Sequence, residues 1–139
     1  MERSLVLIKP DAMKRGLAGT VIARLEKGGV KLVGLKMLHL DEAQAKQHYA
    51  IHQDKPFFSD LVRYITSAPI IAAVFEGENA IEVIRKIMGA TDPAKAETGS
   101  IRGDFGLDIE RNSVHGSDLV ETAREEIKLF FSEEEIFSY

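Results

Sequence analysis

The stretch Asn112-Ser113-Val114-His115-Gly116-Ser117-Asp118 contains the side chain best suited to covalent chemistry, the imidazole of His115. An imidazole with a pKa of ~6.5 is mostly neutral at pH 7 and is therefore a nucleophile. Gly116 lets a ligand approach the backbone closely. We expect a helix to begin near Asp118, and a helix N-terminus favours an anion. The stretch predicts a nucleophilic histidine beside an anion-binding site; the simpler interpretation is a turn with an incidental histidine.

Three cations could complete such a site. Lys9 ends an apolar strand just before Pro10, where a buried amine needs an anionic partner. Arg102 lies in Gly99–Gly106, whose glycines and hydroxyls are typical of a backbone cradle for phosphate, although the spacing is not that of a Walker A loop. Arg85 lies late on an expected helix. The simpler interpretations are a strand-end lysine that reaches solvent, a solvent-facing loop arginine and a charge on a helix's outer face.

Aromatic side chains and three further histidines lie near the middle of the chain. Tyr49, Phe57 and Phe58 flank an expected break between two helices. Such rings usually belong to the core, but one flat ring beside a phosphate site could stack on a nucleobase, at ~1–3 kcal/mol per base. The other histidines have no spacing with carboxylates that indicates zinc, and we interpret them as surface or local polar contacts. They are His39, His48 and His52.

Hydrophobic patterns predict the elements that position these groups. The expected strands are Ser4–Ile8, stopped by Lys9-Pro10-Asp11, then Val30–Leu40, Pro69–Phe75, stopped by Glu76-Gly77, and a short strand around Val114. Helical spacing places helices around Leu17–Leu25, Asp41–Tyr49, Pro56–Ile65, Asn79–Gly89 and Asp118–Lys128. Between Ala90 and Arg111 the periodicity disappears, and a loop of that length is usually functional or disordered.

Cap signals mark the starts of four helices. Asp41-x-x-Gln44 has the pattern of a capping box, and Asn79-x-x-Glu82 and Asp118-x-x-Glu121 repeat its spacing. Pro56 fits the first turn of another helix. The resulting order of strands and helices is a βαββαβ pattern with insertions. It predicts an α+β, ferredoxin-like fold, an antiparallel sheet with helices packed on one face. The length suits a single domain, 1–139.

Composition narrows the classes of function. Hydrophobic residues make up 45% of the chain and charged residues 29%, which argues against disorder or a fibre. Cysteine is absent, which excludes disulfides and thiolate metal sites. The net charge of −4 disfavours nucleic acid as a partner. The N-terminal apolar run is too short for a signal peptide or a membrane span, so we expect a cytoplasmic protein with no membrane partner.

Four segments, in this order, resemble the nucleoside diphosphate kinases. They are Ile8-Lys9-Pro10-Asp11, Pro56-Phe57-Phe58, Ser100-Ile101-Arg102-Gly103-Asp104-Phe105 and Asn112-x-x-His115-Gly116-Ser117-Asp118. The last motif is highly specific for that family, and the similarity runs from about Glu2 to Phe131. The resemblance implies a ferredoxin-like fold and Mg²⁺-dependent, ping-pong transfer of the γ-phosphate from nucleoside triphosphates to nucleoside diphosphates through a phosphohistidine.

The resemblance also implies a role for each site residue. His115 is the phosphorylated nucleophile, and Glu126 orients it. Tyr49 and Ser117 lie near the transferred phosphate. The residues that contact phosphates or ribose hydroxyls are Lys9, Arg85, Thr91, Arg102 and Asn112. The residues that form the base slot are Phe57, which stacks on the base, with Leu61 and Ile109. No metal site on the protein itself is implied, because Mg²⁺ binds mainly to the nucleotide's own phosphates.

The chain departs from the family pattern at three positions. Ala68 stands where glycine is more usual, Ser100 replaces a threonine, and Leu119 replaces a small polar residue. None of these changes removes a chemical group from the site. The residues alone leave two other functions open. A non-catalytic nucleotide-binding regulator would leave His115 idle, and a histidine phosphotransfer module would need no base slot.

The expected strand Val30–Leu40 predicts self-association. In the ferredoxin-like order it lies at an edge of the sheet, with unpaired backbone donors and acceptors. Strict alternation would put Leu32, Leu38 and Leu40 on one face and Val33, Leu35 and Met37 on the other. A twofold partner could cover the second face; the alternative cover is the chain's own segment Ile127–Tyr139. The resemblance favours a homo-oligomer, a tetramer or a hexamer built from dimers.

Overall fold

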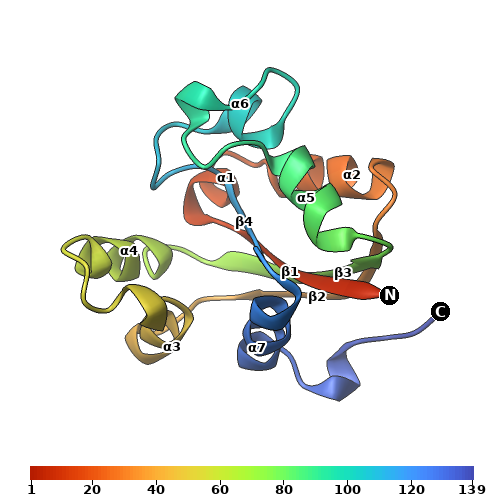
Figure 1. The fold of residues 1–139 in the computed structure, drawn as a ribbon. Helices are drawn as coiled ribbons and strands as arrows, with labels where there is room; N and C mark the ends of the chain where they lie inside the picture. The colour runs from red at the N-terminus through yellow and green to blue at the C-terminus, as the bar shows by residue number, and fades with distance from the viewer.

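A four-stranded antiparallel sheet forms the centre of the molecule in the computed structural model, which describes residues 1–139 (Figure 1). The strands are β1 (Glu2–Ile8), β2 (Lys31–Leu38), β3 (Ile70–Gly77) and β4 (Val114–Gly116). They lie in the order β2-β3-β1-β4, and every neighbouring pair is antiparallel. This is the order that a βαββαβ chain adopts in the ferredoxin-like fold, and the predicted fold is confirmed.

Seven α-helices and three 3₁₀ turns connect and follow the strands. The helices are α1 (Pro10–Lys14), α2 (Ala18–Lys27), α3 (Glu42–His48), α4 (Phe58–Ile65), α5 (Ala80–Met88), α6 (Ile101–Phe105) and α7 (Val120–Phe130). The turns are η1 (Ala50–His52), η2 (Pro93–Lys95) and η3 (Glu133–Glu135). No helix is long and apolar enough to cross a membrane.

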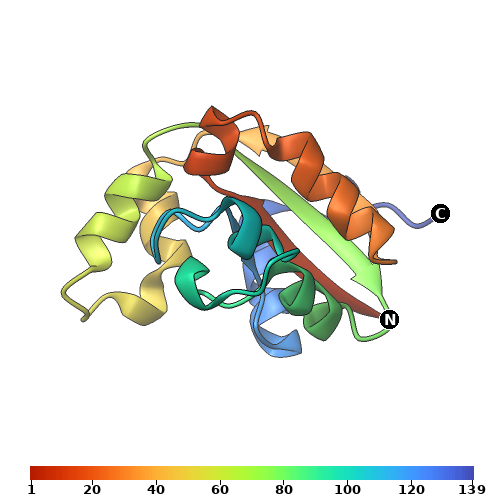
Figure 2. The same cartoon turned by 90° about the horizontal axis from the view of Figure 1, so that it is seen from above.

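Helices cover both faces of the sheet, so the prediction of helices on one face is wrong. Figure 1 shows α2, α5 and α6 above the sheet and α3 and α7 below it, and Figure 2 shows α2 lying along the sheet from above. The cause is visible in β1, where alternate residues face two separate cores. Val6 and Ile8 pack with α1, α2, α5 and α6, whereas Leu5 and Leu7 pack with α3, α4 and α7. A strand that is apolar on both faces needs cover on both.

Several helices begin at other residues than their cap signals indicated. The first strand ends at Ile8, directly before Lys9-Pro10-Asp11 as predicted, and Pro10 in addition opens α1, because a proline is accepted in the first turn of a helix. Pro56 lies before α4, which begins at Phe58. Asn79 precedes α5 in the left-handed region, with φ 53°, and its side chain makes no cap hydrogen bond. Asp118 does not cap α7 either, since Leu119 occupies that position.

Two cap predictions hold closely. Asp41 accepts from the Gln44 backbone and Gln44 accepts from the Asp41 backbone, which is the reciprocal capping box expected at the start of α3. Gly89 ends α5 at φ 86°, a conformation that favours glycine. The third strand does not stop before Glu76 but continues to Gly77.

The segment expected to be an irregular loop contains α6. The Ser100 hydroxyl accepts from the Gly103 backbone amide at 3.1 Å and so caps this helix. Gly103 is required there, because a Cβ atom would lie 2.0 Å from the Glu97 carbonyl oxygen. A helix of five residues is too short to produce a recognisable hydrophobic period.

A bulge in β2 changes which residues share a face. Leu32 pairs with Phe75 and Gly34 with Val74, so Val33 is the extra residue. Val33 therefore lies in the core with α3, α4 and α7, and its expected place beside Leu35 and Met37 is wrong. Leu35 and Met37 remain 50% and 64% exposed.

The C-terminal segment covers part of the β2 edge. The Phe137 amide donates to the Val33 carbonyl at 2.9 Å, and the Tyr139 hydroxyl donates to the Leu32 carbonyl at 2.6 Å. Beyond Val33, the outer side of β2 has no backbone partner within the chain. The backbone pairing of β2 with the chain's own C-terminal segment thus ends before Leu35.

Candidate active site

His115 lies in β4, on the face that α3 and α7 cover, because it pairs with Leu7 of β1. Its Nε2 atom is 3.0 Å from Oε2 of Glu126 on α7. The other carboxylate oxygen accepts from the Ser117 hydroxyl at 2.6 Å, and the Leu5 backbone amide donates to that hydroxyl at 3.1 Å. One chain of hydrogen bonds therefore holds the imidazole relative to the sheet.

Glu126 determines which nitrogen of His115 is free. Burial alone would raise the pKa of Glu126, but hydrogen bonds from His115 and Ser117 and the charge of His115 outweigh it and hold the pKa below its ordinary value. An ionised carboxylate only accepts hydrogen bonds. Nε2 of His115 is therefore the protonated nitrogen, and Nδ1 keeps its lone pair for a reaction.

Lys9 is a buried cation at the end of β1. Its Nζ donates to the Glu110 carbonyl at 2.8 Å and to Asn112 Oδ1 at 3.0 Å, and Asn112 in turn donates to the Thr91 carbonyl at 3.0 Å. Burial, reinforced by the charge of Arg102, lowers the pKa of Lys9 to about 8. The alternative of a lysine that reaches solvent is therefore wrong, since the residue is only 6% exposed.

Arg102 is buried on α6 and is not the solvent-facing loop residue of the simpler interpretation. Its guanidinium donates to the carbonyl oxygens of Gly89 at 3.0 Å and Val114 at 2.7 Å, and its Nε has no partner. Burial and the nearby charge of Arg85 lower the pKa of Arg102 to about 10. Arg85, Arg102 and Thr91 line one cleft of about 460 Å³.

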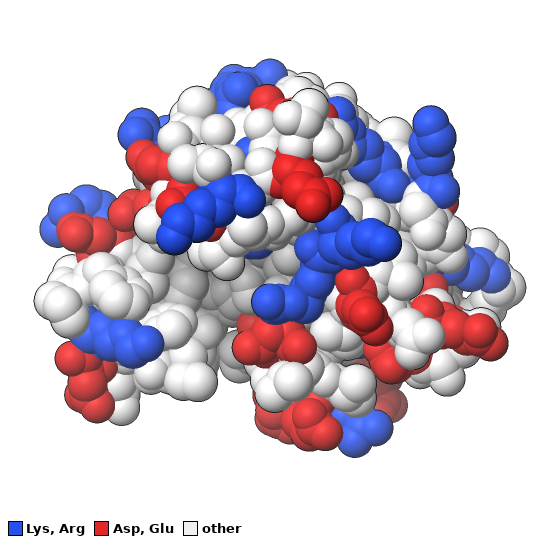
Figure 3. Space-filling view, turned by 45° about the horizontal axis from the view of Figure 1, so that its top comes forward, with Lys and Arg blue, Asp and Glu red and all other residues white.

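These cations have no anionic partner in the protein. Lys9, Arg85 and Arg102 take part in no salt bridge. Lys9 and Arg102 are buried, whereas Arg85 is exposed. Buried charges are normally paired, and here the charge of Arg102 lowers the pKa of Lys9 while that of Arg85 lowers the pKa of Arg102. The Val114 carbonyl that accepts from Arg102 directly precedes His115. Figure 3 shows a hollow in the surface with basic and acidic side chains along its margin. Cations without a carboxylate partner can accept an anionic ligand.

Residues expected to bind a base lie around the break between α3 and α4 and on the segment before β4. Phe57 directly precedes α4 and is 44% exposed, and Leu61 on α4 is half-buried. Ile109 is 61% exposed. Tyr49, at the end of α3, is half-buried, and desolvation together with Glu110 and Glu126 raises the pKa of its hydroxyl. An exposed phenylalanine on a helix start is available for stacking.

His48, interpreted from the sequence as a surface or local polar contact, is not at the surface but lies beside Glu126. Its side chain is 2% exposed, and its ring lies edge-on to that of His115, with 4.9 Å between the ring centroids. Its Nδ1 is 4.0 Å from Glu126 Oε2. Burial and the neighbouring His115 lower the pKa of His48 to about 3, so it is neutral. The sequence does contain a signal for the burial of His48: it lies three residues after the buried Ala45, so both share one face of α3.

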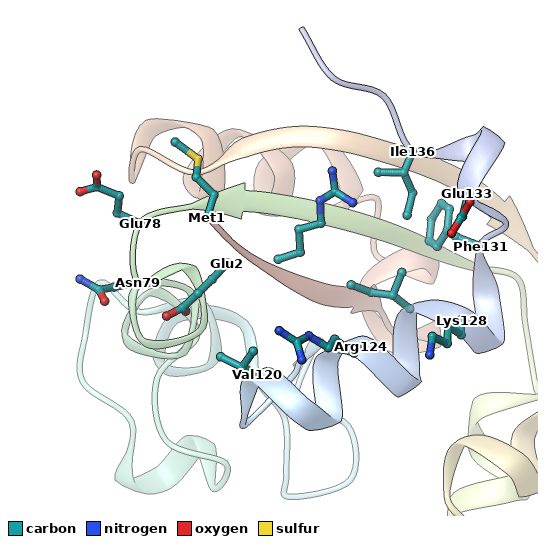
Figure 4. A pocket seen from close by; sticks show the side chains of 12 residues that line it. Met1, Glu2, Glu78, Asn79, Val120, Arg124, Lys128, Phe131, Glu133 and Ile136 are labelled. Atoms are coloured by element: carbon teal, nitrogen blue, oxygen red, sulfur yellow. The ribbon is translucent and has the colours of Figure 1, made fainter.

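A cavity larger than the cleft around Arg85 and Arg102 lies elsewhere. It measures about 760 Å³ and is lined by the start of β1, by α7 and by the C-terminal segment (Figure 4). Its lining includes Glu2, Arg124 and Phe131 but none of the cations or histidines described above. Chemistry, and not cavity size, therefore locates the active site.

A nucleophilic imidazole beside a cleft of unpaired cations is the arrangement expected of an enzyme that transfers phosphate. The family model of the nucleoside diphosphate kinases matches residues 2–136. A nucleoside diphosphate kinase of Dehalococcoides mccartyi is 62% identical over 139 residues, covering 100% of this chain and 98% of that protein. The enzyme of Archaeoglobus fulgidus is 56% identical, with 100% and 92% covered.

Solved structures agree with the sequence comparison. The halophilic nucleoside diphosphate kinase of Halobacterium salinarum, in complex with CDP, has a TM-score of 0.96 at 47% identity, covering 99% of this chain and 92% of that one. The Aquifex aeolicus enzyme has a TM-score of 0.95 at 41% identity, with 98% and 99% covered. The chain belongs to the nucleoside diphosphate kinase family, and it is a phosphotransferase that acts on nucleotides.

Proposed function

We propose that the chain passes the γ-phosphate of a nucleoside triphosphate to a nucleoside diphosphate through a phosphohistidine on His115. The observation that supports this most is the hydrogen bond of 3.0 Å between His115 Nε2 and Glu126, which leaves Nδ1 as the nucleophilic atom. A regulator that only binds nucleotides would have no use for an oriented imidazole, and a histidine phosphotransfer module would have no use for the exposed Phe57.

The reaction takes two displacements at one phosphorus atom. In the first, the Nδ1 lone pair of His115 forms a bond to the γ-phosphorus while the bond to the bridging oxygen breaks, and the diphosphate leaves with that electron pair. Phosphorylation puts positive charge on the imidazole, which keeps its Nε2 proton and is stabilised by Glu126. In the second, a terminal oxygen of another diphosphate attacks the phosphorus, the nitrogen–phosphorus bond breaks, and His115 returns to its first state.

Lys9, Arg85 and Arg102 stabilise the charge that spreads over the transferred phosphoryl oxygens. Their lack of carboxylate partners supports this role, since the field is in place before the substrate arrives. The loss of one such preorganised donor typically costs ~10²–10³ in rate. In this proposal Thr91 and Asn112 contact phosphates or ribose hydroxyls. The hydrogen bonds of Asn112 to Lys9 and to the Thr91 carbonyl support this role, because they keep both residues beside a cation. Tyr49 and Ser117 act close to the transferred phosphate.

Phe57, Leu61 and Ile109 form the base slot in this proposal. Stacking on Phe57 reads the face of a base and not its hydrogen-bonding edges, so purine and pyrimidine nucleotides should both be used. The Halobacterium salinarum relative in complex with CDP supports a slot that accepts a pyrimidine. The kcat/KM values for ADP, GDP, CDP and UDP test this. A preference above ~10⁴ for one base would require polar contacts to its edge and would contradict the slot.

Mg²⁺ is the proposed metal, held mainly by the nucleotide's own phosphates. The residues around the cleft fit that arrangement, because most of its charged lining is basic and Glu97 is its single carboxylate. When bound, Mg²⁺ neutralises charge on the phosphates and fixes their conformation. Lys9, Arg85 and Arg102 then bind the oxygens that the ion leaves free.

We also propose that the protein is a homo-oligomer, a tetramer or a hexamer of dimers. The exposed Leu35 and Met37, and the β2 edge beyond Val33 that has no backbone partner, support a dimer that pairs two β2 strands. The C-terminal segment covers only the first part of that edge. The cytoplasmic location expected from the sequence stays a prediction.

A pulse and chase with labelled nucleotide tests the proposed function. The protein is incubated with ATP labelled in its γ-phosphate and then chased with unlabelled GDP. We expect label on the protein that leaves as GTP, and no label on the His115→Gln variant. His39→Gln is the matched control, because His39 is exposed and its ring makes a hydrogen bond to the Thr66 carbonyl, away from His115. An unlabelled wild-type protein, or label that GDP does not remove, would contradict the proposal.

A further inference from the structure

We propose that His48, His115 and Glu126 form a binding site for Zn²⁺ or a similar transition-metal ion, and that the bound ion inhibits the enzyme. Each residue offers one ligand atom, and these atoms all lie within 4.8 Å of one another. The residues come from α3, β4 and α7, so only the folded chain assembles them. The inhibitory part rests on the proposed role of His115 as nucleophile.

The distances suit a small tetrahedral ion. Zinc bonds of about 2.0–2.2 Å place neighbouring tetrahedral ligands roughly 3.2–3.6 Å apart. His115 Nε2 and Glu126 Oε2 are already 3.0 Å apart, and His48 Nδ1 is 4.0 Å from the same oxygen. Small side-chain rotations of His48 and His115 would complete the set, and water would be the fourth ligand.

His48 provides an independent indication of a missing ligand. Its side chain is 2% exposed, and its Nδ1 has no hydrogen-bond partner although it points to the Glu126 carboxylate. A buried polar atom without a partner costs about 1–3 kcal/mol, so the fold does not place it there for stability. A metal ion between His48 and Glu126 would satisfy this atom.

The ligand set selects transition metals over Mg²⁺. Two imidazoles and one carboxylate suit zinc, as in the His₂Glu sites of zinc enzymes. Mg²⁺ requires octahedral oxygen ligands and gives up its water reluctantly. The magnesium that accompanies the nucleotide therefore does not compete for this site.

Metal binding would remove the nucleophile by moving one proton. Without metal, Nε2 of His115 carries the ring proton and donates a hydrogen bond to Glu126, and Nδ1 has the free lone pair. A metal on Nε2 needs the lone pair of that nitrogen, so the proton leaves Nε2 and the neutral ring is protonated on Nδ1 instead. A protonated Nδ1 cannot attack phosphorus. The ion also takes the carboxylate that would stabilise the phosphorylated ring.

Cobalt(II) is the spectroscopic probe for this site, because a tetrahedral Co²⁺ centre absorbs visible light strongly and Zn²⁺ displaces it. The purified full-length protein, free of nucleotide, is titrated with Co²⁺ and then with Zn²⁺. We expect a strong Co²⁺ absorption that saturates at one ion per chain. The affinity for Co²⁺ should fall at least about tenfold in His48→Gln and stay unchanged in His39→Gln. Should His48→Gln fail to fold, His48→Phe fills the same space without a ligand atom.

Labelling of the protein by γ-labelled ATP, at Zn²⁺ levels fixed by a metal buffer with Mg²⁺ in excess, gives the second readout. We expect Zn²⁺ to block labelling of the wild type. The same inhibition of His48→Gln should need a Zn²⁺ concentration at least about tenfold higher, with the labelling rate of each protein compared with its own rate without metal. No tetrahedral Co²⁺ spectrum, equal metal sensitivity of both proteins, or metal binding without loss of labelling would overturn the proposal. Absent labelling without any metal would instead contradict the proposed function.

Discussion

Nucleotide binding should return a proton to Lys9, and this uptake can be calculated. In the free protein, burial and Arg102 hold the pKa of Lys9 at about 8, well below the ordinary value of 10.5. A phosphate group in the cleft would supply the anionic partner that the amine lacks and would raise this pKa again. Lys9 is therefore partly neutral before binding and charged after it.

The magnitude follows from the pKa of about 8. A group with that pKa is about 10% neutral at pH 7, about 50% at pH 8 and about 90% at pH 9. Binding of ADP with Mg²⁺ should thus take up about 0.1, 0.5 and 0.9 protons per site at these three pH values. The affinity for the nucleotide should therefore fall as pH rises, by about tenfold per pH unit above pH 8, because Lys9 of the free protein must first take up a proton.

Calorimetry in two buffers of different ionisation enthalpy measures the uptake directly. Lys9→Arg is the matched control, since a guanidinium stays charged over this range and should bind without proton uptake. A proton uptake that does not grow between pH 7 and pH 9, or that persists in Lys9→Arg, would refute the assignment of a desolvated amine waiting for phosphate.

Three further predictions concern stability and assembly. Ser117→Ala should lose about 2 kcal/mol of unfolding free energy in urea, because its buried hydroxyl joins the Leu5 amide to Glu126; exposed Ser138→Ala should lose under about 0.5 kcal/mol, and equal losses would contradict the bridge. Gly103→Ala should lower the melting temperature and the turnover, since its Cβ would meet the Glu97 carbonyl at 2.0 Å, whereas Gly19→Ala, with no atom within 4 Å, should do neither. Leu35→Lys with Met37→Lys should give monomers in light scattering, and Ile51→Lys, also at an exposed position, should not; an unchanged oligomer would place the interface elsewhere.

The sequence predicts the strands and most helices because their signals are local. The strand Ser4–Ile8 is signalled by its short apolar run. The start of α3 is signalled by the capping box of Asp41 and Gln44, which lie within four residues of each other. The sequence also predicts that His115 and the cations belong to one site, because their motifs lie beside the ends of predicted strands and helices. By contrast, α6 is missed because five residues show no period, and the burial of Arg102 on that helix therefore has no signal in the sequence.

The remaining errors concern contacts between distant segments. His48 joins the site only because α3 packs beside α7, and nothing near residue 48 encodes Glu126. The helices on both faces follow from how the chain winds around the sheet, and the bulge at Val33 shifts one face of β2 by a single residue. Register and docking are set by tertiary packing, which a local pattern does not contain.

The nitrogen of His115 that carries the phosphate shows which face of the imidazole reacts. Because Nε2 of His115 donates a hydrogen bond to Glu126, the phosphate must be attached to Nδ1. The enzyme is phosphorylated with ATP, hydrolysed in alkali, where phosphohistidine survives, and the two phosphohistidine isomers are separated by chromatography. We expect the Nδ1 isomer alone, and none of it in His115→Gln. Phosphate on Nε2, or on any other residue, would contradict it.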